Sequence, residues 1–224
     1  MIFKNKKVAK EPLTVEKKYL NAINAVKSYA NVIDSIDIIS YLKLIRTAII
    51  EELASEFNNK ILYHGIFEDN EHRAAAVIPY FRWDENSVPY FVELENKYEC
   101  DLSKDKIVSF PWHIDRFVSA FNIVANQGFK YMPTNHRVYY FPQLNLYIAF
   151  NGLHSLGAGV ATKKGIVPCV KAYDLTRMFE TIHSDDGVHW VSNNGNISVD
   201  DISDFRFALI YEISKLIWEK GERL

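Results

Sequence analysis

A short polar run, Asn151-Gly152-Leu153-His154-Ser155, interrupts an apolar part of the chain and carries side chains that could do chemistry. The apolar residues before it predict a buried strand, and the small residues after it predict a helix. A helix that starts where a strand ends leaves its first backbone N–H groups unpaired and pointing to one place, which attracts anions. Gly152 would let a ligand approach the backbone, Ser155 adds a hydroxyl, and the His154 ring can donate to a phosphate or transfer a proton near neutral pH.

This pattern predicts a phosphate-binding turn in which Asn151, Gly152 and Ser155 bind the ligand and His154 is the catalytic residue. The alternative from the same residues is an ordinary Asn-Gly turn followed by a hydrogen-bonded structural histidine. No cofactor is implied by either interpretation.

Three more ligand-binding candidates, Trp112, His113 and Arg116, follow Pro111 at the start of a second expected helix. Residues three and four apart share one side of a helix, so these side chains could face the ligand together, with Arg116 neutralising its charge. Alternatively, Trp112 packs as a hydrophobic staple and Asp115 complements the helix dipole. Other candidate cations and polar groups are Asn135-His136-Arg137, Lys163 and Lys164.

Two groups of histidines and acids raise the question of a metal site: His64, Glu68, Asp69 and His72, and then His183, Asp185, Asp186 and His189. Neither group has the His-x-x-x-His spacing on a helix that would make a zinc site specific. Both lie in segments that we expect to be loops, so we interpret them as solvated loops and predict no metal site. The two cysteines, Cys100 and Cys169, have no neighbouring partner that would suggest a zinc site or a disulfide framework.

The elements that must position the candidate site follow from the apolar spacing. Amphipathic helices are expected from Val15, with Thr14 as the N-cap, and again after Ser35. A hairpin is expected with strands at 77–83 and 88–94. Between 107 and 172 the expected order is β-α-β-β-α-β: strand 107–110, a helix from 114 ending at Gly128, strands 138–141 and 144–150, a short helix after Asn151, and strand 166–172. A last helix runs from about 203 to 220.

The fold class predicted is therefore α+β: a small mixed sheet, flanked by two N-terminal helices and a C-terminal helix. We expect residues 1–60 to form a helical pair packed on an α+β core at 61–224, together one compact domain. At 224 residues and 48% hydrophobic composition the chain can fill a sizeable core. Its net charge of −2 gives no global reason to expect nucleic acid or an anionic membrane, and no signal peptide or membrane span is recognisable. A bacterial, cytoplasmic protein is the expectation.

The middle of the chain resembles a known unit. A strand followed by Pro111 and Arg116, a helix ending at Gly128, and the strand that enters the turn at residues 151–155 are similar in order to the N-terminal domain of the ParB and sulfiredoxin superfamily. The likeness covers 107–176, about a third of the chain. It implies that Gly152 and His154 lie in a phosphate-gripping turn, with Pro111 and Arg116 on the entering side.

The departures from that superfamily limit what the resemblance implies. Leu153 stands where ParB nucleotidases carry glutamate and sulfiredoxin its nucleophilic cysteine, so neither chemistry transfers. Ser155 stands where the turn ends in a phosphate-gripping arginine. The chain also looks like a member of an uncharacterised bacterial family with an Asn-Gly-x-His-Ser signature.

Three functions remain open at this point, and the third, a nuclease-like domain, would require Asp185, Asp186 or Glu68 to converge on a metal. The first is binding of a phosphate-bearing small molecule, in particular a nucleotide, at the turn, with or without phosphate transfer or hydrolysis. The second is a non-enzymatic interaction protein with a protein or DNA partner, such as an accessory factor of a bacterial mobile element or defence system. Leu153 favours this second function, because it stands where the resembled superfamily carries its catalytic residue. The sequence predicts neither an oligomeric state nor a membrane partner.

Overall fold

The computed structural model describes residues 12–30, 35–64, 89–194 and 198–221. The elements, in chain order, are α1 (Val15–Ala30), α2 (Ser35–His64), β1 (Val92–Glu93), β2 (Glu99–Asp101), β3 (Ile107–Val108), α3 (Ile114–Gln127), β4 (Arg137–Phe141), the 3-10 turn η2 (Pro142–Leu144), β5 (Leu146–Asn151), α4 (Leu153–Thr162), β6 (Ile166–Pro168), β7 (Lys171–Asp174), α5 (Thr176–Thr181), β8 (Ile182–His183), β9 (His189–Ser192), β10 (Ser198–Asp201) and α6 (Phe205–Glu219). The predicted α+β class is confirmed.

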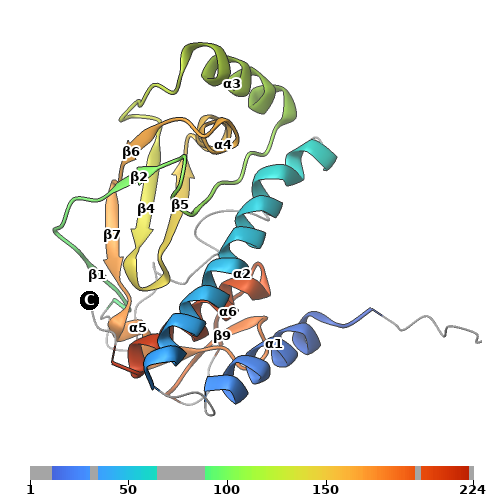
Figure 1. Ribbon diagram of the computed structural model, residues 1–224, viewed down its shortest axis with the longest axis vertical. Coiled ribbons are helices and arrows are strands. Elements are labelled where there is room, and N and C mark those ends of the chain that lie inside the picture. Colours follow the sequence, from blue (N-terminus) through green and yellow to red (C-terminus); the bar gives the residue numbers. More distant parts are fainter. Residues whose placement is uncertain (1–11, 31–34, 65–88, 195–197, 222–224) are drawn as a thin grey trace, which may run out of the picture.

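A mixed five-stranded sheet, in the order β1-β7-β4-β5-β3, forms the centre of the molecule. Strands β4 and β5 pair antiparallel, whereas β3 pairs parallel with β5 and β7 pairs parallel with β4. Figure 1 shows α3 and α4 together at the top of the view, above the strands, while α1, α5 and α6 gather near the bottom. The turn after β5 therefore lies at the α3 and α4 end of the sheet.

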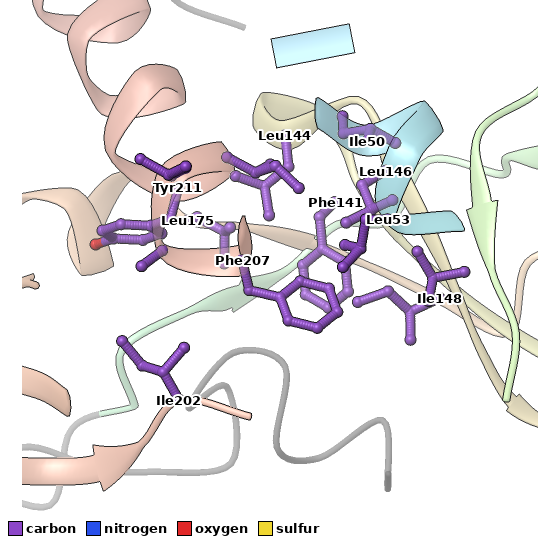
Figure 2. Packing of buried hydrophobic residues seen from close by; sticks show 14 of the residues in the cluster. Ile50, Leu53, Phe141, Leu144, Leu146, Ile148, Leu175, Ile202, Phe207 and Tyr211 are labelled. Carbon is purple, nitrogen blue, oxygen red and sulfur yellow. The ribbon is translucent and has the colours of Figure 1, made fainter. Parts of the chain in front are cut away.

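The strand β5 is buried on both faces because alternate side chains enter different cores. Leu146 and Ile148 join a large core that contains α2 and α6 residues, and Figure 2 shows Ile50, Leu53 and Phe207 around them. Tyr147 and Ala149 join a smaller core with Leu156 of α4. Because a hydrophobic core covers each face of β5, nearly all of its residues are apolar and the sequence shows no alternation of apolar and polar positions.

The helix α6 anchors the lower half of the fold and is buried over most of its length. Asp204 caps its N-terminus, since the Asp204 side chain accepts from the Arg206 backbone N–H. The Arg206 side chain is 6% exposed and pairs with Asp204 at 2.6 Å and, from α2, with Glu56 at 2.7 Å. This buried guanidinium therefore ties α6 to α2.

Several sequence-based boundaries need correction. The expected strand 166–172 is two strands: β6 pairs with β2, and β7 pairs with β4 and β1. The chain crosses between two sheets at this point, so one apolar run serves both. Strand 144–150 begins instead at Leu146, because Pro142–Leu144 form a 3-10 turn. The expected hairpin has its first strand, 77–83, outside the described residues, and within them β1 pairs with β7.

The N-terminal helices form as the apolar spacing predicts. Thr14 caps α1, because its Oγ1 accepts from the Lys17 backbone N–H at 3.3 Å. Tyr19, Ile23 and other buried residues of α1 lie on one side of the helix, which contacts α6. Among the described residues, none of the helices is both long enough and apolar enough to cross a membrane.

Candidate functional site: the facing N-termini of α3 and α4

The strand-turn-helix at 146–162 is present as the sequence predicts. Gly152 is the N-cap of α4, with φ 74° and ψ 27°, and no side chain caps the helix. A Cβ at this position would lie 2.6 Å from His136 Cδ2 and 2.9 Å from the Asn135 carbonyl oxygen. The glycine is therefore required by its left-handed conformation and by the close approach of Asn135 and His136. The sequence predicts a glycine that admits a ligand, but it does not predict this close packing.

A second helix N-terminus faces this turn. His113 is the N-cap of α3, again without a side-chain cap, and its backbone N–H donates to Nε2 of His154 at 3.1 Å. Gly157 allows the approach, because a Cβ there would lie 3.2 Å from both Phe117 Cε2 and Pro111 Cγ. Ser109 adds a hydrogen bond from Oγ to the Leu153 carbonyl at 2.8 Å. The positive ends of two helix dipoles are thus brought together.

Aromatic contacts extend the cluster to the predicted cation. The Trp112 and His154 rings lie edge to face, with centroids 5.3 Å apart. The Arg116 guanidinium carbon lies 4.8 Å from the centroid of the Trp112 ring, a cation–π distance. Four of the predicted residues, from two helix starts, therefore form one group: Trp112, His113, Arg116 and His154.

The electrostatics of this cluster are positive. Burial, the Arg116 charge and His113 together lower the pKa of His154 to about 4. The ring is therefore neutral at pH 7. Because Nε2 accepts from the His113 backbone, the ring proton of the neutral form sits on Nδ1, which has no hydrogen-bond partner among the described residues. In this state His154 can donate a hydrogen bond from Nδ1 but cannot act as an acid.

The depressed pKa of His154 predicts a pH-dependent stability. Between 6.5, the ordinary value, and about 4 the unfolded chain binds a proton that the folded chain does not, so stability falls as the pH falls through this window. Relative to His154→Gln, which can still accept from His113, the wild-type protein should lose on the order of 1 kcal/mol from pH 7 to pH 4, after allowance for solvent screening of the half-exposed ring. Urea unfolding of both proteins across this range measures the difference. Parallel profiles would show that the fold does not suppress protonation of His154.

The remaining predicted ligand-binding residues border the cluster. Asn151 is exposed at the end of β5, opposite Arg137 of β4 in the strand register. Ser155 is half-buried in the first turn of α4. His113 contributes an additional polar atom, since its Nδ1 is buried without a hydrogen-bond partner among the described residues.

Two of the candidate cations are in the wrong place for this cluster. Lys163 is the C-cap of α4 and Lys164 follows it, at the opposite end of the helix from Gly152. A helix of this length separates its ends by roughly 15 Å. Lys163 instead lines a cavity of about 460 Å³ between α2 and the β2–β3 turn, and Lys164 Nζ donates to the Ala125 carbonyl. Of the four candidate cations, Arg116 and Arg137 are the two that lie near the turn.

The other histidines have structural surroundings. His136 is 2% exposed, its Nδ1 accepts from the Met132 backbone N–H, and burial lowers its pKa. His183 and His189 lie in strands β8 and β9 rather than in the expected loops, each beside its own carboxylate, Asp185 and Asp186 respectively. In the part of the chain that the structure describes, no group of three or more histidines, cysteines and acids is arranged to hold a metal ion. Of the 64–72 group, Glu68, Asp69 and His72 lie outside the described residues, as does the His64 side chain.

The comparisons with known proteins assign the chain to a family but indicate no activity. The model of a family of unknown function, DUF6710, matches residues 3–223, so the chain belongs to that family. No curated protein and no solved structure matches the chain. A functional proposal must therefore come from the geometry of the site.

Proposed function

We propose that the protein binds a phosphate-bearing small molecule, of the nucleotide class, between the N-termini of α3 and α4. One observation carries the proposal: the hydrogen bond from the His113 backbone to His154 Nε2 holds two helix N-termini against each other, and neither helix is capped by the side chain of its own N-cap residue. Each terminus presents backbone N–H donors and the positive end of a dipole. An anion is the ligand that this arrangement favours.

The residues of the cluster have separate roles in this binding. The first backbone N–H groups of α4 and the Nδ1–H of His154 donate to phosphate oxygens, and Arg116 supplies the positive charge. Trp112 positions Arg116 through the cation–π contact. The likeness of 107–176 to the ParB and sulfiredoxin unit supports a phosphate ligand at this turn, and Leu153 supports binding rather than the reactions of that superfamily.

Catalysis by His154 would depend on the ligand itself. A bound phosphate dianion would favour the protonated ring and raise its pKa above about 4, and the ring would then give up the hydrogen bond from His113, because Nε2 also carries a proton in the imidazolium. Only in the complex could His154 then transfer a proton to a phosphate oxygen. We propose a bacterial cytoplasmic setting, in keeping with the two free cysteines.

Isothermal titration with inorganic phosphate and with nucleoside mono-, di- and triphosphates tests the proposal. We expect the wild-type protein to bind at least one of them, and Arg116→Gln to weaken that binding by about tenfold, the effect of losing one charge-assisted contact. His154→Ala should weaken it as well. Lys163→Gln is the matched control, because it removes a cation from the far end of α4 and should leave the affinity unchanged.

Two results would contradict the proposal that phosphate binds at this site. Equal weakening by Lys163→Gln and Arg116→Gln would mean that the ligand responds only to total charge and not to this site. Absence of binding to the wild-type protein would make the two helix termini structural, and the interaction function given above would become the better account.

A further inference from the structure

A second cavity, of about 250 Å³, lies between α1, α6 and the segment after β8. Figure 1 shows α1 and α6 in the lower half of the view. Six ionisable side chains line it, and they carry both signs of charge: Lys27, His183, Asp185, Glu212, Lys215 and Glu219. It shares no residue with the α3 and α4 cluster. Whatever binds here is therefore separate from the phosphate ligand proposed above.

The wall of this cavity contains a buried carboxylate. Glu212 is 7% exposed, and its Oε1 accepts from the Ser184 backbone N–H at 2.9 Å. Among the described residues it forms no ion pair, and burial raises its pKa above the ordinary value. An acid that is buried beside a cavity, with a single hydrogen bond and no cation in contact, lacks the compensation that buried charges require.

Two ammonium groups flank the same cavity without contacting Glu212. Lys215 Nζ lies 3.4 Å from the Ile182 carbonyl, and Lys27 is exposed on α1. Their charges act on Glu212, since both favour its ionised form. Glu212, Asp185 and Glu219 favour a positive group in the cavity and the two lysines favour a negative group, so a ligand that carries both charges can satisfy both sets.

We propose that this cavity binds a small zwitterion that carries a primary ammonium and a carboxylate, the chemistry of a free α-amino acid. The ammonium donates to the Glu212 carboxylate, and the ligand carboxylate lies toward Lys27 and Lys215. Such a molecule supplies the missing partner of the buried acid and also satisfies both lysines. Its size fits a cavity of about 250 Å³.

The test uses the full-length protein and the twenty amino acids, titrated singly by calorimetry. We expect at least one to bind and both mono-functional analogues, butylamine and butyrate, to bind at least about tenfold more weakly, since each leaves one charge unpaired. Glu212→Gln keeps an acceptor for the Ser184 N–H but loses the negative charge, and it should weaken the amino acid by about tenfold or more. Lys27→Gln should weaken it by about threefold. Glu16→Gln, an exposed change on α1 outside the cavity, is the control and should have no effect.

Three results would overturn the inference. They are failure of every amino acid to bind, equal binding by the wild-type and Glu212→Gln proteins, or an analogue that binds as tightly as the amino acid. Should Glu212→Gln fail to fold, Lys27→Gln decides the question, because Lys27 is exposed and its replacement should leave the fold intact. Phosphate binding at α3 and α4 is measured in separate titrations, so the two proposals fail independently.

Discussion

Gly152→Ala is expected to lower the free energy of unfolding by about 3 kcal/mol, as the sum of left-handed backbone strain and overpacking. The strain arises because Gly152 has φ 74°, and the overpacking arises because the new Cβ would lie 2.6 Å from the buried His136 ring. The Asn135 carbonyl, at 2.9 Å, cannot move without disturbing the start of β4. Chemical denaturation of the variant measures the loss.

A control at the other end of the same helix separates the two causes. Lys163 is also left-handed, with φ 57°, so Lys163→Gly should stabilise the protein by up to about 1 kcal/mol through relief of strain alone. A loss in Gly152→Ala no larger than this gain would mean that the backbone strain explains the whole effect. The close packing that we infer behind the turn would then be wrong.

Arg206→Met is expected to cost about 3 kcal/mol, because it removes a buried charge whose partners remain. The guanidinium donates to Asp204 from both Nε and Nη2, and it also pairs with Glu56 and Glu52 of α2. Methionine fills similar space but leaves the Asp204 carboxylate, which is only 16% exposed, without its main partner. Loss of the α2 connection should also increase hydrogen exchange at the start of α6.

The exposed ion pair between Lys171 and Glu93 provides the comparison for this prediction. Lys171→Met should change stability by less than about 1 kcal/mol, as is usual for surface pairs. Arg206→Lys, which keeps the charge and loses the two-point contact with Asp204, should fall between the two methionine variants. If Arg206→Met and Lys171→Met lowered the free energy of unfolding by similar amounts, burial would not make the Arg206 ion pairs more stabilising than an exposed pair, and the prediction would be wrong.

Local patterns in the sequence predict most of the elements but not their partners. The three-and-four spacing of α1 and the Pro111 to Gly128 bounds of α3 are local signals, and both are present. The division of 166–172 between β6 and β7 depends on β2, a strand 65 or more positions earlier that has no apolar alternation of its own. The small sheet β10-β9-β8 has a different cause, since its strands have only two to four residues each and are too short to show an alternation of apolar and polar residues.

The residues of the candidate site could likewise be predicted from the sequence, but the contacts between them could not. Trp112, Arg116 and His154 could be grouped from their residue types and their places at helix starts. The contact that joins them, from the His113 backbone to His154 Nε2, could not be predicted, because it depends on how closely α3 packs on α4. Nor could the Glu212 cavity, since Glu212 looks like any exposed acid on an amphipathic helix until α1 and the segment after β8 cover it.

The most direct test of phosphate binding at α3 and α4 is a ¹⁵N NMR titration of the His154 ring, assigned by loss of its signals in His154→Gln. Without ligand, we expect a proton on Nδ1, none on Nε2 and a pKa of about 4. Saturating inorganic phosphate should raise that pKa, because a bound anion stabilises the imidazolium, while the pKa of His189, in β9 and outside the α3 and α4 cluster, should be unaffected. A His154 pKa and ring spectrum that stay the same with and without phosphate would contradict the proposal.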